Sequence, residues 1–139
     1  MTEQEIRTIL NRQREYFATG ATLSRKFRAE QLGKLKASLQ RHEEELNAAL
    51  QQDLGKSRME SYMCEIGLTL SELTWMQKHL RGLMQEKRVP TPLSQFAAIS
   101  FRSPSPYGTV LIMSPWNYPV LLTLDPLIDA IAAGNTAVV

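Results

Sequence analysis

The chain has 139 residues and a mean hydropathy of −0.24; 43% of its residues are hydrophobic and 22% are charged. This balance is typical of a globular domain and excludes a disordered or collagen-like chain. The net charge of +2 is too small to indicate a nucleic-acid partner, and the one long apolar tract, residues 107–124, is interrupted by Pro115 and Pro119, so no transmembrane segment is expected in this portion.

Two features concern the cellular compartment. The first five residues are polar and acidic, whereas a secretory signal needs a basic start and an apolar stretch. Cys64 is the single cysteine and cannot form an internal disulfide, which fits a reducing compartment. We therefore expect a cytoplasmic protein.

Charge is distributed unevenly along the chain. Residues 1–88 contain 15 of the 16 basic and 12 of the 14 acidic residues. Residues 89–139 keep only Arg102, Asp125 and Asp129. The first part is therefore expected to be amphipathic and the second part mostly buried.

The first part is predicted to be helical. The spacing of Thr2 and Glu5 is that of a capping box, and apolar residues follow at helical spacing until Gly20, which predicts a helix over residues 3–19. Leucines then recur every three or four positions from Leu32 to Leu54, which predicts a second, long helix that ends at Gly55.

A third helix is predicted after a second capping box, at Ser57 and Glu60. Its apolar positions run from Met59 to Met84, and the prolines at 90 and 92 break the pattern. The two long helices are joined by a short link at Gly55, so they are expected to pack antiparallel as a helical hairpin.

The period changes after Pro92. Residues 95–102 alternate in the manner of a strand, and a turn follows at residues 103–106. Residues 108–113 form a continuous apolar run, which is typical of a central parallel strand covered on both faces.

A strand–helix–strand unit is predicted at the end of the chain. Pro119 suits the first position of a nearly all-apolar helix that ends at Gly134, with a kink or restart at Pro126, and Thr136 opens another buried strand. This unit cannot cover its own surfaces, so the chain is expected to be a piece of a longer polypeptide.

The turn at residues 114–119 is the candidate ligand site, because it joins the carboxyl end of a parallel strand to a helix, where open α/β sheets bind ligands. Two interpretations stay open. In the structural one, Asn117 is a helix N-cap and Trp116 a core anchor. In the functional one, the Asn117 amide donates to a developing oxyanion and the turn lies against a cofactor.

The chain resembles the NAD(P)-dependent aldehyde dehydrogenase superfamily. The resemblance is carried by the motif Pro-Trp-Asn-Tyr-Pro at residues 115–119 and by Ala-Ala-Gly-Asn at residues 132–135. Residues 18–22, 53–56 and 88–92 extend it to the class 3, fatty-aldehyde and coniferyl-aldehyde-like branch.

The resemblance implies an α/β fold that is a fragment of a larger aldehyde dehydrogenase. Residues 1–92 would be the helical segment of the cofactor-binding domain, residues 93–105 a β arm related to the oligomerisation sheet, and residues 106–139 the truncated start of a Rossmann-like parallel sheet. It also implies a homodimer of the complete protein and a small-molecule aldehyde as substrate.

The resemblance assigns roles to six residues. Asn117 matches the catalytic asparagine, Tyr118 matches a position near the substrate tunnel, and the cofactor, NAD or NADP, would be bound by Met113, Ser114, Pro115 and Trp116. The nucleophilic cysteine and the general-base glutamate of the family would lie beyond Val139, so this chain alone is expected to be inactive.

Other chemistry-bearing residues have simpler interpretations. Cys64 is expected to be an ordinary buried or half-buried thiol, and His42 and His79 to be packed or edge-exposed, so no metal site is indicated. The basic residues around Arg28 are expected to form a solvated helix face.

Two alternative functions stay open. One is a helical-hairpin interaction module without catalysis, to which the methionines of the hairpin could contribute. The other is a semialdehyde or acyl reductase on the same scaffold.

Overall fold

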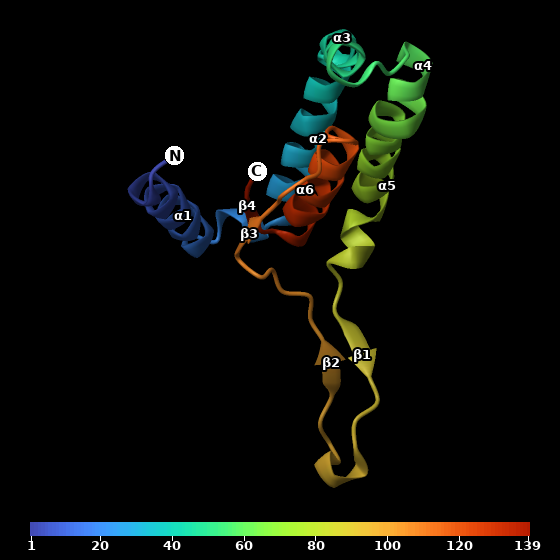
Figure 1. Ribbon diagram of the computed structural model, residues 1–139. Helices are drawn as coiled ribbons and strands as arrows, with labels where there is room; N and C mark the ends of the chain where they lie inside the picture. Colours follow the sequence, from blue (N-terminus) through green and yellow to red (C-terminus); the bar gives the residue numbers. More distant parts are fainter.

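The computed structural model describes all of residues 1–139. It consists of helices and two small sheets (Figure 1). The helices are α1 (Glu3–Ala18), α2 (Arg25–Arg41), α3 (Glu43–Leu54), α4 (Arg58–Ser61), α5 (Gly67–Leu83) and α6 (Leu121–Ala133). The strands are β1 (Lys87–Val89), β2 (Ser100–Arg102), β3 (Thr109–Leu111) and β4 (Thr136–Val138). Short helical turns occupy η1 (Ala21–Leu23), η2 (Tyr62–Ile66) and η3 (Leu93–Gln95).

The predicted first helix is confirmed as α1. Its capping box is formed, because the Thr2 hydroxyl accepts from the Glu5 amide and the Glu5 carboxylate accepts from the Thr2 amide. The helix ends before Gly20, which has a left-handed φ of 73° that favours glycine.

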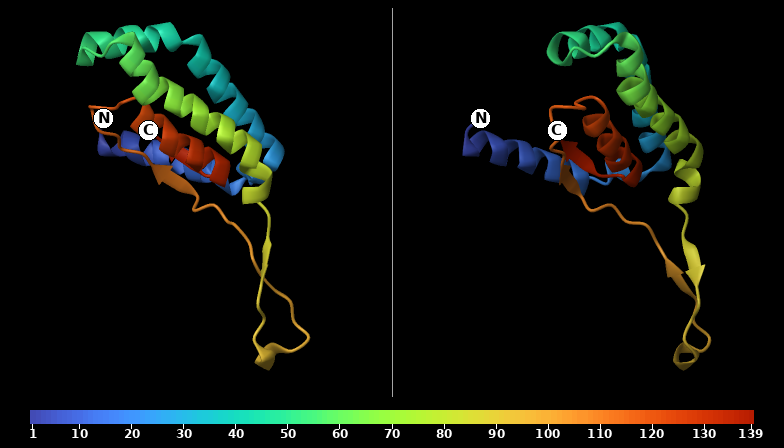
Figure 2. Two further views of the ribbon diagram at one scale, coloured as in Figure 1. Left: turned by 90° about the vertical axis from the view of Figure 1, so that its right-hand side faces the viewer. Right: turned by 45° about the vertical axis from the view of Figure 1, so that its right-hand side comes forward.

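The predicted second helix is wrong in one respect, because it is divided at His42 into α2 and α3. The backbone of His42 leaves the helical region, with φ of −101° and ψ of 14°. Three glutamates follow, Glu43, Glu44 and Glu45, and acidic residues are favourable in the first turn of a new helix. As a result α3 turns away from the direction of α2 toward α4 (Figure 2).

Helices α2 and α5 run antiparallel, as predicted, and α6 packs against both (Figures 1 and 2). The apolar faces of these amphipathic helices meet in one core, and their polar faces are turned to solvent. The buried members of this core are Leu32, Leu39, Leu50, Ile66, Leu73, Met76, Leu80, Ile128 and Ala132. None of the helices combines the length and hydropathy that a membrane span requires.

The β arm is an antiparallel pair, β1 and β2, that extends away from the helices (Figure 1). The strand predicted over residues 95–102 is shorter, because Leu93–Gln95 form a turn and Ala97 has a left-handed φ of 77°. The partner strand β1 was not predicted. Its residues lie in the sequence stretch that we assigned to the end of the third helix.

The second sheet is a parallel pair, in which Thr109, Val110 and Leu111 of β3 stand opposite Thr136, Ala137 and Val138 of β4. Both strands were predicted. The expectation that β3 is central and covered on both faces is not met within these 139 residues, because β4 is its one neighbour and Leu111 is 66% exposed. Helix α1 packs against both strands.

Helix α6 is continuous, so of the two effects expected at Pro126, a kink or a restart, the restart is wrong. The helix also begins at Leu121, two residues later than Pro119. A proline removes a single backbone hydrogen bond, to the carbonyl four residues earlier, and both Pro126 and Leu122 lie on the exposed side of α6. Water can therefore satisfy the free Leu122 carbonyl.

The expectation of a solvated basic face is wrong for Arg28, which is buried between α2 and the end of α6. Its guanidinium donates to the Thr22 carbonyl at 2.9 Å and to the Ala132 carbonyl at 3.0 Å. A cation at the C-terminus of α6 is also favourable for the helix dipole. Burial lowers the pKa of this guanidinium from its ordinary value. Arg28 thus joins η1, α2 and α6.

Candidate functional site

All six predicted site residues lie on one exposed turn between β3 and the start of α6. Met113 is 85% exposed and Trp116 is 80% exposed. The Ser114 hydroxyl accepts from the Thr123 hydroxyl at 2.6 Å, which fixes the turn to α6. The turn follows the carboxyl end of β3, the edge at which ligands bind to parallel sheets.

The structural interpretation of this turn, with Asn117 as a helix N-cap and Trp116 as a core anchor, is wrong for these residues. Helix α6 has Val120 at its N-cap position and no side-chain cap from its own residues, so Asn117 is not an N-cap. Trp116 is exposed and therefore is not a core anchor within these residues. The Asn117 side chain is itself exposed, while its backbone carbonyl accepts a hydrogen bond from the Lys56 ammonium at 2.9 Å.

The first amides of α6 are satisfied by a residue from a distant segment. One carboxylate oxygen of Glu65 accepts from the amides of Val120 at 2.8 Å and Leu121 at 3.3 Å. This carboxylate is 0% exposed. A negative charge at a helix N-terminus is favourable, because the first amides have no partner within the helix.

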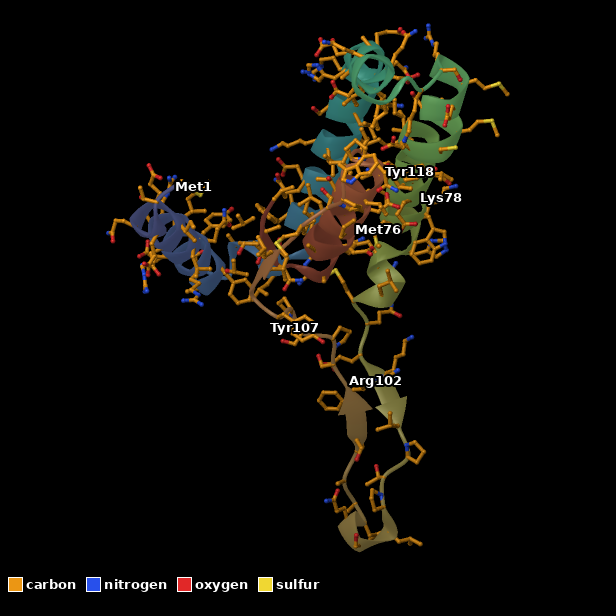
Figure 3. All side chains as sticks on the ribbon, in the orientation of Figure 1. Met1, Met76, Lys78, Arg102, Tyr107 and Tyr118 are labelled. Atoms are coloured by element: carbon orange, nitrogen blue, oxygen red, sulfur yellow. The ribbon has the colours of Figure 1, made fainter.

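Lys56 completes the group. Its ammonium lies 2.5 Å from the other Glu65 oxygen and 3.9 Å from the centre of the Tyr118 ring. The second contact is a cation–π interaction. Figure 3 shows Tyr118 near the N-terminal end of α6, on the side of α5. The turn is therefore held at Asn117, Tyr118, Val120 and Leu121.

Lys56 and Glu65 are the site residues that sequence reasoning missed. Glu65 lies between Cys64 and Ile66, off the apolar positions of the predicted third helix, where a charged residue is ordinary. The sequence pattern therefore gave no signal that this carboxylate is buried. Cys64 is half-buried, as expected. No group of three or more His, Cys, Asp or Glu side chains is arranged to hold a metal ion.

The residues of the turn fit a bound organic cofactor. Met113 and Trp116, three positions apart in the sequence, expose two large apolar side chains against which a planar ring could pack. Ser114 and Pro115, which lie between them, are exposed as well. The geometry thus defines an α/β protein with an exposed turn that follows the carboxyl end of a parallel strand.

Comparison with known proteins gives the family. The profile described as "Aldehyde dehydrogenase family" matches residues 1–139, and the chain belongs to that family. The chain is 45% identical over 124 residues, 89% of its length, to 4,4'-diaponeurosporen-aldehyde dehydrogenase of Staphylococcus aureus. It is 44% identical over 129 residues, 93% of its length, to human aldehyde dehydrogenase family 3 member B1. The predicted resemblance to the class 3 branch is confirmed.

A solved structure titled as the substrate-bound state of Staphylococcus aureus AldH matches with a TM-score of 0.92 and 43% identity over 95% of the chain. An NADP complex of glyceraldehyde-3-phosphate dehydrogenase from Methanocaldococcus jannaschii has the same fold, with a TM-score of 0.84, 20% identity and 99% of the chain covered. The predicted α/β fold, a portion of an aldehyde dehydrogenase, is confirmed. The chain spans 27–29% of the length of these relatives.

A half-buried carboxyl group, that of Asp125, lies on α6. Burial raises the pKa of Asp125 above its ordinary value of 3.8; a hydrogen bond with Thr69 opposes this shift, and the negative charges of Glu72 and Asp129 add to it. The folded protein therefore binds this proton more tightly than the unfolded chain does. It follows that the contribution of Asp125 to stability is present below about pH 4 and is lost as the pH rises through the raised pKa.

We expect Asp125→Asn to raise the thermal unfolding midpoint of the complete protein more at about pH 7 than at about pH 4, since asparagine carries no charge to desolvate. Differential scanning calorimetry at both pH values measures the two shifts. The control is Asp53→Asn, which changes an exposed aspartate on α3. Equal shifts for Asp125→Asn at both pH values would contradict the prediction.

Proposed function

We propose that this chain is the N-terminal portion of a longer aldehyde dehydrogenase, which oxidises an aldehyde to a carboxylic acid with transfer of hydride to NAD or NADP. The observation that carries the proposal is the position of Asn117. Its side chain is exposed on the turn after β3, while its backbone is fixed by Lys56, so the amide group is free to donate to a substrate.

The proposed role of Asn117 is to stabilise negative charge. When a cysteine thiolate attacks an aldehyde carbonyl, the carbonyl oxygen becomes an oxyanion in the resulting thiohemiacetal. A neutral amide donor held in place stabilises that oxygen without reorganising during the reaction. The cysteine and a general-base glutamate would come from residues outside the 139 described, because Cys64 is half-buried in η2 rather than on the turn.

The same turn would bind the cofactor. Met113, Ser114, Pro115 and Trp116 are the residues that would hold NAD or NADP, which supplies the acceptor for the hydride. Their role is to position the cofactor and to exclude water, and both demands suit large exposed apolar side chains. Tyr118, whose ring contacts the Lys56 ammonium, would border the path of a small-molecule aldehyde.

The complete protein is proposed to be a cytoplasmic homodimer. Support comes from the β arm, where Leu93, Phe96, Ile99 and Phe101 are exposed and lie away from the helices. The arm extends from the body as an antiparallel pair, a shape that a second copy could cover (Figure 2). The family match to all 139 residues does not favour the alternative of a helical interaction module or of a reductase.

The test is an assay of the complete protein for aldehyde-dependent reduction of NAD and of NADP. The absorbance of the reduced nicotinamide measures the turnover. We expect turnover with the complete protein and none with the purified 139-residue chain, because the nucleophile and the base would be missing. Absence of turnover by the folded complete protein across aliphatic and aromatic aldehydes would contradict the proposed function. Turnover by the 139-residue chain would contradict the proposed mechanism.

A further inference from the structure

We infer that the buried pair Lys56–Glu65 positions Asn117 for the reaction, so that these two residues act on the chemistry through the turn and not by touching the substrate. The inference rests on the proposed function. Neither residue belongs to the turn: Lys56 is 61 positions before Asn117, and Glu65 is 55 positions before Val120.

The first step of the argument is how Glu65 fixes the start of α6. Helices usually obtain an N-terminal cap from a Ser, Thr, Asp or Asn of their own chain segment. Helix α6 has none, and its first amides are instead bound by the Glu65 carboxylate. The position where α6 begins, directly after the turn, is therefore set by the helical layer to which Glu65 belongs.

The second step is how Lys56 fixes the other end of the turn. Its ammonium donates both to Glu65 and to the Asn117 carbonyl, and it lies over the Tyr118 ring. Because the hydrogen bond is to the backbone of Asn117, it restrains the Cα from which the side-chain amide projects. The ion pair thus binds the backbone before Pro119, through Lys56 at Asn117, and after Pro119, through Glu65 at Val120.

The third step is that the local backbone is distorted to bring Glu65 there. Residues Tyr62–Ile66 form a π turn, which the amide of Gly67 closes by donating to the Tyr62 carbonyl five residues earlier. A Cβ atom on Gly67 would lie 2.7 Å from that carbonyl oxygen, so the turn requires glycine. Such π turns occur frequently at functional sites because they redirect side chains.

Stability alone is a poor explanation for this arrangement. Desolvation of two buried charges offsets most of their attraction, and apolar pairs of similar volume are often as stable. A buried ion pair does, however, define one geometry, because both groups must keep their partners. A defined geometry is what an oxyanion donor requires.

The decisive experiment is a double-mutant cycle in the complete enzyme with Lys56→Met, Asn117→Ala and the double variant. If Lys56 acts through Asn117, we expect Lys56→Met to lower kcat by about 10- to 100-fold while the KM for the cofactor stays within about threefold. The double variant should then be no slower than Asn117→Ala alone. Losses that multiply in the double variant would overturn the inference.

A matched control separates positioning from loss of stability. Lys36→Met removes another lysine hydrogen bond of the same helical layer, the 2.7 Å contact from Nζ to the Thr74 hydroxyl, which involves no residue of the turn. We expect it to lower the unfolding midpoint without lowering kcat. An equal fall in kcat for Lys36→Met and Lys56→Met would show that Lys56 has only a structural role.

Glu65→Gln provides a readout that does not depend on activity. Glutamine keeps an oxygen that can accept from the amides of Val120 and Leu121 but loses the charge that pairs with Lys56. Hydrogen exchange of residues 117–124, measured by mass spectrometry, should then accelerate at Leu122, whose amide donates to the Tyr118 carbonyl, and stay slow at Val120 and Leu121. Unchanged exchange throughout the segment would contradict the inference.

The outcomes also distinguish this inference from the proposed function. If Asn117→Ala leaves kcat unchanged, the proposed role of Asn117 fails whatever Lys56 does. If Asn117→Ala lowers kcat but Lys56→Met does not, the proposed function stands and the inference about the pair is wrong. Lys56→Arg, which keeps the positive charge, should recover part of the kcat lost in Lys56→Met, and no recovery would count against positioning by the charge.

Discussion

Replacing Asn117 with alanine in the complete enzyme is expected to lower kcat by about 10²–10³-fold, which corresponds to about 3–4 kcal/mol of transition-state stabilisation. The reason is that a fixed amide donor is lost where negative charge develops. Its backbone is bound by Lys56, so the side chain needs little reorganisation to donate. The measurement is kcat with a saturating aldehyde.

Stability measurements on Asn117→Ala complete this test. A lost N-cap would destabilise the protein by about 1 kcal/mol, but Val120 occupies the N-cap position of α6, so the unfolding midpoint should change little. Asn117→Asp places a negative charge where the oxyanion forms and should be at least as slow as Asn117→Ala. A folded Asn117→Asp enzyme with the parental kcat would eliminate the catalytic role.

Replacing Arg28 with methionine is expected to destabilise the protein by about 2–4 kcal/mol, because two buried carbonyls, those of Thr22 and Ala132, lose a charged donor. Methionine fills a similar volume, so the loss reflects the hydrogen bonds more than a cavity. Urea unfolding of the complete protein, followed by circular dichroism, measures the change.

Arg25→Met is the control for Arg28→Met. Arg25 is exposed on the same helix, one turn before Arg28, and its replacement should change the free energy of unfolding by no more than about 0.5 kcal/mol. If Arg28→Met is as mild as Arg25→Met, then the side chain of Arg28 is effectively solvated and the buried placement is wrong.

Much of the fold follows from local signals in the sequence. The capping box at Thr2, the N-cap at Ser57 and the glycines at 55 and 134 set helix ends correctly, because each of them acts within one turn of the chain. The break at His42 could not be predicted in the same way, since leucines keep their spacing through it. Strand β1 depends on pairing with β2, which no local pattern records.

The residues of the candidate site likewise fall into those with a local signal in the sequence and those without one. Asn117 and its neighbours were predicted because position after a strand and a local motif both point to them. Lys56 and Glu65 were missed because their importance arises only when segments more than 50 positions apart meet. The π turn adds to the difficulty, since one extra residue shifts Glu65 out of the helical phase that the sequence pattern assumes.

The packing of α1 on the second sheet has a consequence for synthesis of the protein. The Thr136 hydroxyl donates to the Gln13 carbonyl across 123 positions, and no residue of α1 is fully buried. At about 5–20 residues per second, the ribosome needs about 6–25 seconds to add β4 after α1 has been made. A lone amphipathic helix of this length is only marginally stable in water. Helix α1 is therefore expected to reach its native place only after β4 has been synthesised.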